Sequence, residues 1–402
     1  MTERLPLLSA QLAFAMYTQR SDRKAVIALR FRTPPARLAT GSVRAVLRSL
    51  VLRNPALSHR IVFSQGSVHQ EWYPAECEFA ELRAPNSESR SQRVLEAIEE
   101  SESATEGPPI SARLIRSPEC DELVLVLDHA FVDEQSLELV KRQLAAPAEP
   151  DRCRPTRYRE AVEQQIAAEA AAAGGPGIEF WADRLETAGG SFPKPHEETA
   201  RFVPVRKLPS VAVPAGFRGS PFPYVLYSLH RALQDVGGPG PTVIGYPWAN
   251  RPPSHSDVVG CFMNTVLSIA PGGPARKPED FVAQWHDEIE HADVPYTAVA
   301  ALGPVFHGAV AAYLDYTHVA DLAVPVAGVP AVRVPQTHVR TPPTCAFQAA
   351  AVVSGDALHL RLSLDERITG YGAREFGSRW HHWLAAAIST LTEAKSSPPT
   401  SP

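Results

Sequence analysis

A histidine and two aspartates follow an apolar run in the first half of the chain, and these residue types can move protons. Residues 123–127 read LVLVL, and Asp128, His129 and Asp133 come after them. A histidine suits proton transfer near neutrality because its ordinary pKa is about 6.5. The apolar run predicts a buried strand that ends at His129. Two interpretations follow: a catalytic histidine at a strand end, or an ordinary turn in which Asp133 or Ser136 caps the next helix.

Strands and helices are predicted to alternate along the whole chain, which favours a mixed α/β (α+β) class. Strands are predicted at 24–31, 59–63, 68–74, 110–116, 123–129, 241–248, 266–271 and 357–365. Helices are predicted at 41–57, 93–100, 136–145, 223–233, 281–290 and 374–391.

Two halves of similar size are expected, because an Ala-rich helical pattern ends at Gly174-Gly175-Pro176-Gly177, a signal for a helix stop and a hinge. We therefore predict an N-terminal lobe at 1–160, an inter-lobe linker at 161–190, a C-terminal lobe at 191–393 and a disordered tail at 394–402.

Composition excludes several classes of function. The chain has 402 residues, 44% hydrophobic and 21% charged residues, and a net charge of -5, which gives no reason to expect nucleic acid or an anionic membrane as a partner. No apolar run is long enough to span a bilayer. The five cysteines are scattered and form no cluster with histidine, so neither a disulfide framework, a zinc site nor any other metal site is expected. A reducing cytoplasm fits this cysteine use.

Several segments, taken in order, resemble one protein family over nearly the whole chain. The sequence is similar to condensation domains of nonribosomal peptide synthetases, here as a free-standing protein. The similar segments are LPLLSAQLAF (5–14), LRNPALSHRIVF (52–63), EGPPISARLIR (106–116), the stretch 158–186, VIGYPWANRPPSHSDVVGCFMNTVLSIAP (243–271) and the stretch 358–384. The resemblance implies two chloramphenicol-acetyltransferase-like lobes in a V-shaped pseudo-dimer, with the active site in a central tunnel.

The family signature His-His-x-x-x-Asp-Gly falls on residues 128–134. His129 and Asp133 match it, whereas Asp128 replaces the first histidine and Glu134 replaces the glycine. The resemblance implies that His129 assists proton movement as an amine attacks a thioester. It also implies that Asp133 pairs with Arg251 through two parallel charge-assisted bonds and so fixes the loop that carries His129. The alternative for Arg251 is a solvated side chain in a Pro-rich loop.

The two departures have consequences of their own. A carboxylate beside His129 favours the charged imidazole and so raises its pKa, although Asp128 and His129 are adjacent in a strand and should face opposite sides. Glu134 would narrow the tunnel, bind a cationic substrate or mark a domain that no longer condenses. Asn264, in CFMNTV, is expected to orient backbone and line the tunnel, or else to be a simple turn or strand-edge asparagine.

Three functions therefore stay open. The first is a stand-alone condensation enzyme that transfers an acyl or aminoacyl thioester from a carrier protein to an amine or an alcohol. The second is a heterocyclization enzyme, because Asp128 to Ser136 also resembles that group's Asp-x-x-x-x-Asp-x-x-Ser motif. The third is a degenerate domain that brings another enzyme to a carrier protein.

The expected partners follow from the first function. They are a peptidyl or acyl carrier protein and a small amine or alcohol, or a second carrier-bound aminoacyl group. The substrate would arrive on the phosphopantetheine arm of the carrier, so no bound cofactor, metal or ATP is expected. We expect a monomer.

Overall fold

The structure is a computed structural model, and the part of the chain that it describes forms two compact units. Unit 1 lies within residues 1–171, 249–263 and 321–336, and unit 2 within 172–248, 264–320 and 337–402. The described residues are 4–64, 66–73, 76–145, 155–188, 202–215, 217, 219–238, 240–272, 277–302, 306, 309–318, 323–340, 345 and 347–396.

Unit 1 contains a six-stranded sheet in the order β14-β15-β2-β7-β6-β5 and a three-stranded sheet in the order β1-β4-β3. Its elements are β1 (Arg4–Leu5), α1 (Ser9–Ser21), β2 (Val26–Thr33), α2 (Thr40–Arg53), η1 (Pro55–Ser58), β3 (His59–Ser64), β4 (Ser67–Trp72), β5 (Glu78–Arg83), α3 (Ser87–Ser103), β6 (Ile110–Arg116), β7 (Asp121–Asp128), η2 (His129–Phe131), α4 (Glu134–Gln143), α5 (Pro155–Ala173, whose last two residues fall in unit 2), η4 (Pro253–His255), β14 (Ala323–Val326) and β15 (Val329–Arg333).

The two faces of the large sheet in unit 1 differ in polarity. Leu123, Leu125 and Leu127 of β7 belong to the apolar core, together with the buried side of α2. The alternate residues of β7 face the other way, where buried Glu122 accepts hydrogen bonds from Arg30 and Arg32. Because side chains alternate along a strand, the last residue of β7 faces the polar side of the sheet.

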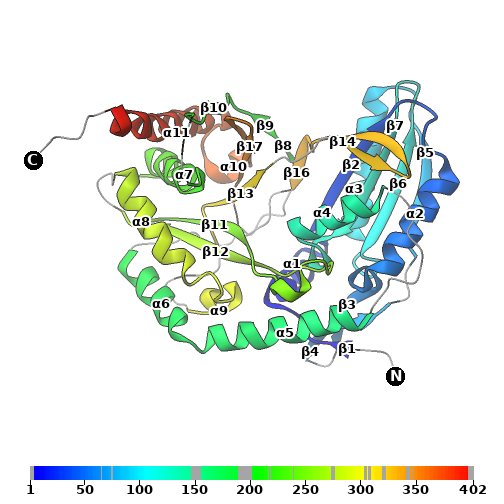
Figure 1. Cartoon of the computed structure of the whole chain (residues 1–402), viewed down its shortest axis with the longest axis horizontal. Coiled ribbons are helices and arrows are strands. Elements are labelled where there is room, and N and C mark those ends of the chain that lie inside the picture. Colours follow the sequence, from blue (N-terminus) through cyan, green and yellow to red (C-terminus); the bar gives the residue numbers. More distant parts are fainter. Residues whose placement is uncertain are drawn as a thin grey trace, which may run out of the picture. The chain divides into compact units, whose positions relative to one another are not determined.

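Two segments from the second half of the sequence complete unit 1. The predicted C-terminal lobe at 191–393 includes both, but strand β15 pairs with β2, Val332 opposite Arg32, beside the N-terminal strands (Figure 1). Segment 249–263 carries Arg251, which is bonded within unit 1. Backbone pairing and this ion pair are the physical reasons why the boundary predicted from sequence order does not match the compact units.

Unit 2 is built on a seven-stranded sheet in the order β10-β18-β17-β13-β11-β12, with β9 also paired to β18, and on a two-stranded sheet of β16 and β8. Its elements are α6 (Pro176–Ala188), β8 (Phe202–Pro204), β9 (Arg206–Lys207), β10 (Val211–Ala212), α7 (Phe222–Gly237), β11 (Thr242–Ala249), β12 (Met263–Ala270), α8 (Pro278–Ile289), α9 (Tyr296–Ala300), β13 (Ala312–His318), β16 (His338–Arg340), β17 (Phe347–Ser354), β18 (Ala357–Leu364), α10 (Glu366–Thr369) and α11 (Ala373–Ser396).

Helices α7 and α11 lie side by side in unit 2 (Figure 1). Ten of the sixteen residues of α7 are buried, which explains its strongly apolar sequence. The indole of Trp380, on α11, is fully buried and donates to Ser228 Oγ of α7 at 3.1 Å. This hydrogen bond satisfies two polar groups inside an otherwise apolar contact.

All of the helices predicted from sequence are present, and the helix stop at Gly174 is confirmed by the gap between α5 and α6. The prediction missed β13, β17 and the hairpin of β14 and β15. The predicted disordered tail at 394–402 is wrong for residues 394–396, which continue α11, and its remainder lies outside the described residues. None of the described helices is both long and apolar enough to cross a membrane.

Candidate active site

His129 is the first residue of the short turn η2, directly after β7. Its backbone N–H donates to Ala25 O at 2.8 Å, and its ring stacks on that of Phe14 with 4.3 Å between centroids. Its Nδ1 lies 2.9 Å from Val132 O. A carbonyl oxygen only accepts, so Nδ1 carries the proton and Nε2 of the neutral ring keeps its lone pair. The imidazole is thus arranged to accept a proton at Nε2.

Burial lowers the pKa of His129, although the nearby carboxylates of Asp133 and Asp128 oppose the shift. The expectation that Asp128 raises this pKa is therefore outweighed by desolvation. A lowered pKa keeps the imidazole neutral at pH 7, which is the form that a general base requires.

Asp133 directly precedes α4, and its carboxylate accepts hydrogen bonds from two backbone N–H groups and one side chain. Its Oδ1 accepts from Ser136 N at 2.8 Å and so caps α4, and its Oδ2 accepts from Phe262 N at 2.9 Å. Arg251 Nη2 donates to both oxygens, at 2.7 and 2.9 Å. Helix capping and ion pairing were alternative interpretations of this aspartate, and the structure shows both.

Arg251 forms the expected ion pair with Asp133. Both of its bonds to Asp133 come from Nη2, one to each carboxylate oxygen. Its Nη1 donates to Val258 O, and its Nε donates to Gln135 Oε1 at 3.2 Å. Only 3% of its side chain is exposed, so Arg251 is not a solvated loop residue.

Ser136 and Gly260 extend this contact. Ser136 Oγ donates to Gly260 O at 2.7 Å and accepts from Gly260 N at 3.0 Å and from Arg251 Nη2 at 2.9 Å. A Cβ at Gly260 would come within 2.3 Å of the Phe262 ring, so only glycine fits there. The segment that carries Arg251 is thus bonded to the start of α4 at several points.

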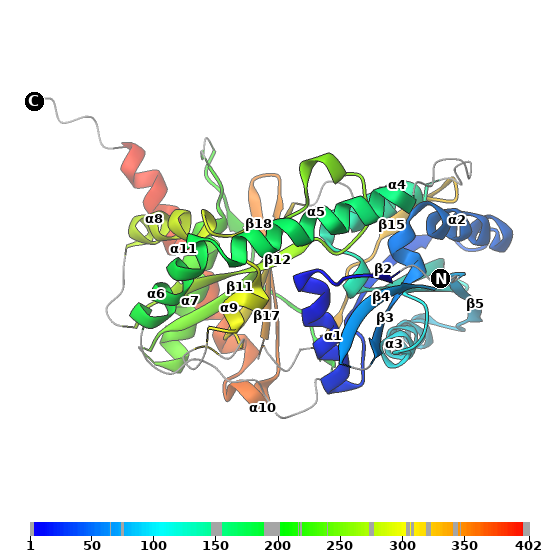
Figure 2. The same cartoon turned by 90° about the horizontal axis from the view of Figure 1, so that it is seen from below.

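Gln11, a residue of the SAQ stretch in α1, holds the middle of the His129 turn. Its Nε2 donates to Ala130 O at 2.9 Å, and its Oε1 accepts from Gln70 Nε2 of β4 at 2.9 Å. Tyr158 OH donates to Gln70 Oε1 at 2.6 Å. These buried polar groups come from three elements, of which α1 and β4 can be followed in Figure 2. The network fixes the backbone on which the imidazole is mounted.

This network was not predicted as part of the site. Gln11 lies in a segment that resembles the family, which is the only signal in the sequence that points to it. Phe14, one turn later on α1, reads as an ordinary apolar helix residue. Tyr158 is 147 positions from Gln11, and nothing in the sequence links the two.

Asp128 is the last residue of β7 and faces the polar side of the sheet. Its Oδ1 accepts from Ala130 N at 3.0 Å, which caps η2, and its Oδ2 lies 3.7 Å from Lys24 Nζ. Burial raises the pKa of Asp128, and Lys24 opposes this shift. That Asp128 supports the site stays a prediction.

Glu134 is the first residue of α4 and its side chain is exposed. Its crowded, partly desolvated surroundings nevertheless raise its pKa, while Arg333 and Lys141 act in the opposite direction. That Glu134 meets a substrate stays a prediction.

Asn264 uses its amide within unit 2. Its Nδ2 donates to Ala292 O at 2.9 Å and to Val294 O at 2.7 Å, and its Oδ1 accepts from Tyr296 N at 2.9 Å. Asn264 therefore orients backbone, as expected. The same bonds occupy its amide, so contact with a substrate lacks support from this geometry.

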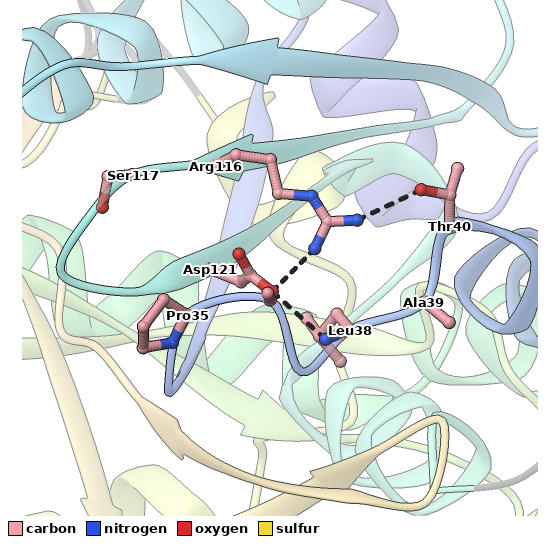
Figure 3. Close-up of a pocket in the computed structure, with 8 residues that line it drawn as sticks. Pro35, Leu38, Ala39, Thr40, Arg116, Ser117 and Asp121 are labelled. Atoms are coloured by element: carbon pink, nitrogen blue, oxygen red, sulfur yellow. Dashed lines mark hydrogen bonds and ion pairs between the residues drawn. The ribbon is translucent and has the colours of Figure 1, made fainter.

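A pocket of about 460 Å³ lies at the opposite end of β7 from His129. Figure 3 shows Arg116 at this pocket, bonded to Asp121, the first residue of β7, and to Thr40. Eight strand residues span roughly 25 Å, so this pocket is not the place where His129 acts. Among the described residues, no group of three or more His, Cys, Asp or Glu side chains could hold a metal ion.

Comparison with solved structures identifies the fold. The X-domain in complex with OxyB from teicoplanin biosynthesis is 17% identical over 98% of this chain and 94% of that chain, with a TM-score of 0.75. A variant of the starter condensation domain of the rhizomide synthetase RzmA, in complex with C8-CoA and Leu-SNAC, is 14% identical over 97% and 94%, with a TM-score of 0.74. The epimerization domain from the third module of tyrocidine synthetase B is 14% identical over 98% of both chains, with a TM-score of 0.71.

The chain thus has the fold of condensation-type domains of nonribosomal peptide synthetases, and the predicted mixed α/β class with chloramphenicol-acetyltransferase-like architecture is confirmed. No protein-family model matches the sequence, and neither does a curated protein sequence.

Proposed function

We propose that this protein is a condensation-type acyltransferase that moves an acyl or aminoacyl group from a carrier-protein thioester to an amine or an alcohol. The observation that carries the proposal is the bond of His129 Nδ1 to Val132 O, which leaves Nε2 of a neutral imidazole available as a base. Capping by Asp128 and Asp133 and the bond from Gln11 fix the turn at its start, end and middle.

The proposed reaction needs only one proton acceptor. The nucleophile attacks the thioester carbonyl carbon and gives a proton to Nε2 of His129. The tetrahedral intermediate then collapses, the C–S bond breaks, and the imidazolium returns the proton to the departing thiolate of the pantetheine arm. The thioester supplies the driving force. A positioned base of this kind contributes roughly 10²- to 10⁴-fold to the rate.

Solved structures with this fold support the expected kinds of partner. The rhizomide synthetase domain holds an acyl-CoA and an aminoacyl thioester analogue, which are the two kinds of substrate that condensation needs. We extend this to a carrier-borne donor and a small or carrier-borne acceptor. We propose the cytoplasm as its location, because the scattered cysteines of the sequence favour a reducing compartment.

A heterocyclization enzyme is less well supported. That interpretation makes Asp128 and Asp133 the two aspartates of the heterocyclization motif. However, Asp128 caps η2 next to Lys24, and Asp133 caps α4 next to Arg251. Each carboxylate is occupied by its own helix end and its own cation.

A recruiting domain is the second candidate. Glu134 stands in place of the family glycine, and the X-domain with the same fold was solved bound to another protein, OxyB. For this chain, the partner would be an enzyme that acts on the carrier-bound substrate.

A single-turnover assay tests the proposal. An acyl-loaded carrier protein is mixed with a panel of amines and alcohols, and intact mass spectrometry follows the loss of the acyl group. Transfer by the wild type that falls at least a hundredfold in His129→Ala supports the proposal. The matched control is His359→Ala, which removes an exposed histidine on β18 and should leave transfer unchanged.

Two other results would shift the assignment. Transfer that survives in His129→Ala removes this residue from the chemistry. Tight carrier binding without transfer by the wild type favours the recruiting domain, and transfer regained in Glu134→Gly would then identify Glu134 as the block.

A further inference from the structure

Lys24 is a buried cation on the polar face of the unit 1 sheet, two residues before β2. It is 7% exposed, and its Nζ donates to Gly107 O at 2.8 Å. The same ammonium group lies 3.7 Å from Asp128 Oδ2. Both side chains are removed from bulk water, at 8% and 11% exposure. A buried charge is retained at tolerable cost only when an opposite charge or hydrogen bonds compensate it, so each of these groups depends on the other.

The carboxylate of Asp128 shapes the turn that presents His129. Its Oδ1 accepts from Ala130 N at 3.0 Å, while its Oδ2 faces Lys24. The next residue toward β2, Ala25, accepts the backbone N–H of His129 at 2.8 Å. Residues 24–25 therefore contact both the carboxylate and the backbone at the start of η2.

We infer that Lys24 is a positioning residue: its ammonium group holds the carboxylate of Asp128 against Ala130 N and thereby fixes the turn that sets the direction of His129 Nε2. The inference rests on the function proposed above. In the family signature, the position of Asp128 is a histidine that is expected to support the site. We assign this supporting role to Lys24 and Asp128 together. Nothing in the motif itself points to Lys24, which lies 104 positions before Asp128.

The other charged groups around this pair have partners of their own. Glu102 of α3 accepts the backbone N–H of Lys24 through its main-chain oxygen, and its side chain pairs with Arg23 at 3.6 Å. Glu78 of β5, which lines the same small pocket as Lys24 and Asp128, pairs with Arg113. Lys24 is thus the cation that the structure places against Asp128.

The test compares four variants with the wild type. Lys24→Met removes the charge and the bond to Gly107, whereas Lys24→Gln keeps a donor for Gly107 and removes only the charge. Lys24→Met combined with Asp128→Asn removes both charges and keeps an oxygen to accept from Ala130 N. The matched control is Arg116→Met. It breaks the Arg116–Asp121 pair (2.6 Å), and Asp121 lies at the end of β7 opposite to Asp128.

The first readout is the ¹⁵N NMR signal of the His129 ring, assigned with His129→Ala. It reports which ring nitrogen carries the proton, whether or not the protein transfers an acyl group. We expect a single Nδ1–H form in the wild type and in Arg116→Met, a mixed or broadened signal in Lys24→Met and Lys24→Gln, and recovery of the single form in the double variant.

The second readout is acyl transfer. We expect kcat to fall roughly ten- to a hundredfold in Lys24→Gln with KM unchanged, because a misplaced base affects the chemical step. The double variant should have a kcat much closer to the wild-type value than that of Lys24→Met, since its two substitutions are coupled through one contact.

Several outcomes would overturn the inference. In one, Lys24→Gln matches the wild type in both readouts. In another, the double variant stays as impaired as Lys24→Met, which would mean that Lys24 does not act through Asp128. Should Lys24→Met fail to fold, Lys24→Gln and the double variant still decide. A wild type without transfer refutes the proposed function but leaves the NMR comparison intact.

Discussion

Gln11 and Ala130 are joined by a 2.9 Å hydrogen bond across 119 positions of sequence, and this bond ties helix α1 to the turn that carries His129. The same helix supplies Phe14, on which the imidazole stacks. One helix therefore sets both the backbone of the turn and the face of the ring. Disturbing α1 should affect the chemistry without touching the motif itself.

Gln11→Leu tests this relationship. The substitution removes the bond from Gln11 to Ala130 O and the bond from Gln70 Nε2 to Gln11 Oε1, a loss of about 1–3 kcal/mol in the free energy of unfolding. Gln70 Nε2 keeps its other bond, to Pro6 O at 2.8 Å. We expect kcat to fall roughly tenfold or more with little change in KM, because the imidazole is displaced. Steady-state kinetics and thermal unfolding measure the two effects. Gln92→Leu, at an exposed position of α3, is the control, and equal effects in both variants would contradict the prediction.

Replacing Arg251 should cost more stability than breaking an exposed ion pair. In Arg251→Met, the buried carboxylate of Asp133 loses its cation, a change that typically costs about 3–5 kcal/mol. Arg251→Lys should recover only part of this, because an ammonium group cannot reach Asp133, Val258 and Gln135 together. Chemical denaturation gives the free energies of unfolding.

The control for Arg251 is Arg157→Met. Arg157 pairs with Asp257 at the surface of unit 1, where both side chains are at least 36% exposed, and such pairs contribute about 1 kcal/mol or less. Similar losses in Arg157→Met and Arg251→Met would show that the Asp133 contact does not stabilise the turn.

The activity should depend on pH through His129. Burial lowers the pKa of this imidazole, and the neutral form is the base. We therefore expect kcat/KM to rise with pH to a plateau. The midpoint of the rise should lie below the ordinary histidine pKa of about 6.5. Phe14→Ala opens one face of the ring to water and should move the midpoint upward toward that value. A pH–rate profile of both proteins measures the shift. A midpoint above 6.5 in the wild type would contradict the assignment.

Because of a buried glutamate in unit 2, the stability of the folded protein should fall as pH rises. Most carboxylates in folded proteins have the opposite effect. Burial raises the pKa of Glu288 to about 7, against the opposing effect of Arg184. Its Oε1 accepts from Arg184, Gln284 and Ile269 N, whereas Oε2 has no hydrogen-bond partner among the described atoms. A carboxyl group held in an environment of this kind favours the protonated form.

The sign follows from proton binding. Between the ordinary value and about 7, the folded protein holds a proton on Glu288 that the unfolded chain has released, so stability is lost as pH rises through this window. The full shift corresponds to a free energy on the order of 3 kcal/mol. We expect the melting temperature to fall between pH 5 and pH 8, and to fall less in Glu288→Gln. Glu279→Gln, exposed on the same helix, should keep the wild-type dependence, and an unchanged slope in Glu288→Gln would refute the prediction.

Local patterns were sufficient to predict the strand, turn and helix around His129. The apolar run of β7 and the spacing of Leu137 and Val140 depend on neighbours in sequence, and those neighbours also decide the burial of these elements. The pairing of Asp133 with Arg251 followed from resemblance and is present, but its geometry was beyond sequence. Which nitrogen of Arg251 meets the carboxylate depends on where Val258 O and Gln135 lie.

Long-range features could not be predicted for a physical reason. Strand β15 pairs with β2 through backbone N–H and C=O groups, which nearly every residue has. The residue types of β15 therefore do not indicate which strand it pairs with. The direction of the His129 pKa depends on burial by distant parts of the chain, whereas sequence showed only the adjacent carboxylate. Lys24 was not predicted as part of the site because a single lysine at the start of a predicted strand is typical of a solvated position.

Unit 1 is built from segments that are far apart in the sequence, so its candidate site can be completed only late in translation. Asp133 is made 118 residues before Arg251, and β2 leaves the ribosome about 300 residues before the strand that covers its edge. Until then, the carboxylate of Asp133 lacks its cation, and β2 has a row of unpaired backbone N–H and C=O groups along one edge. Such unpaired groups can bind other chains. A fragment that ends near residue 171 should consequently be aggregation-prone, although it already contains His129. His129 is among the early products of translation, whereas the contact of Arg251 with Asp133 forms only after 118 further residues have been made.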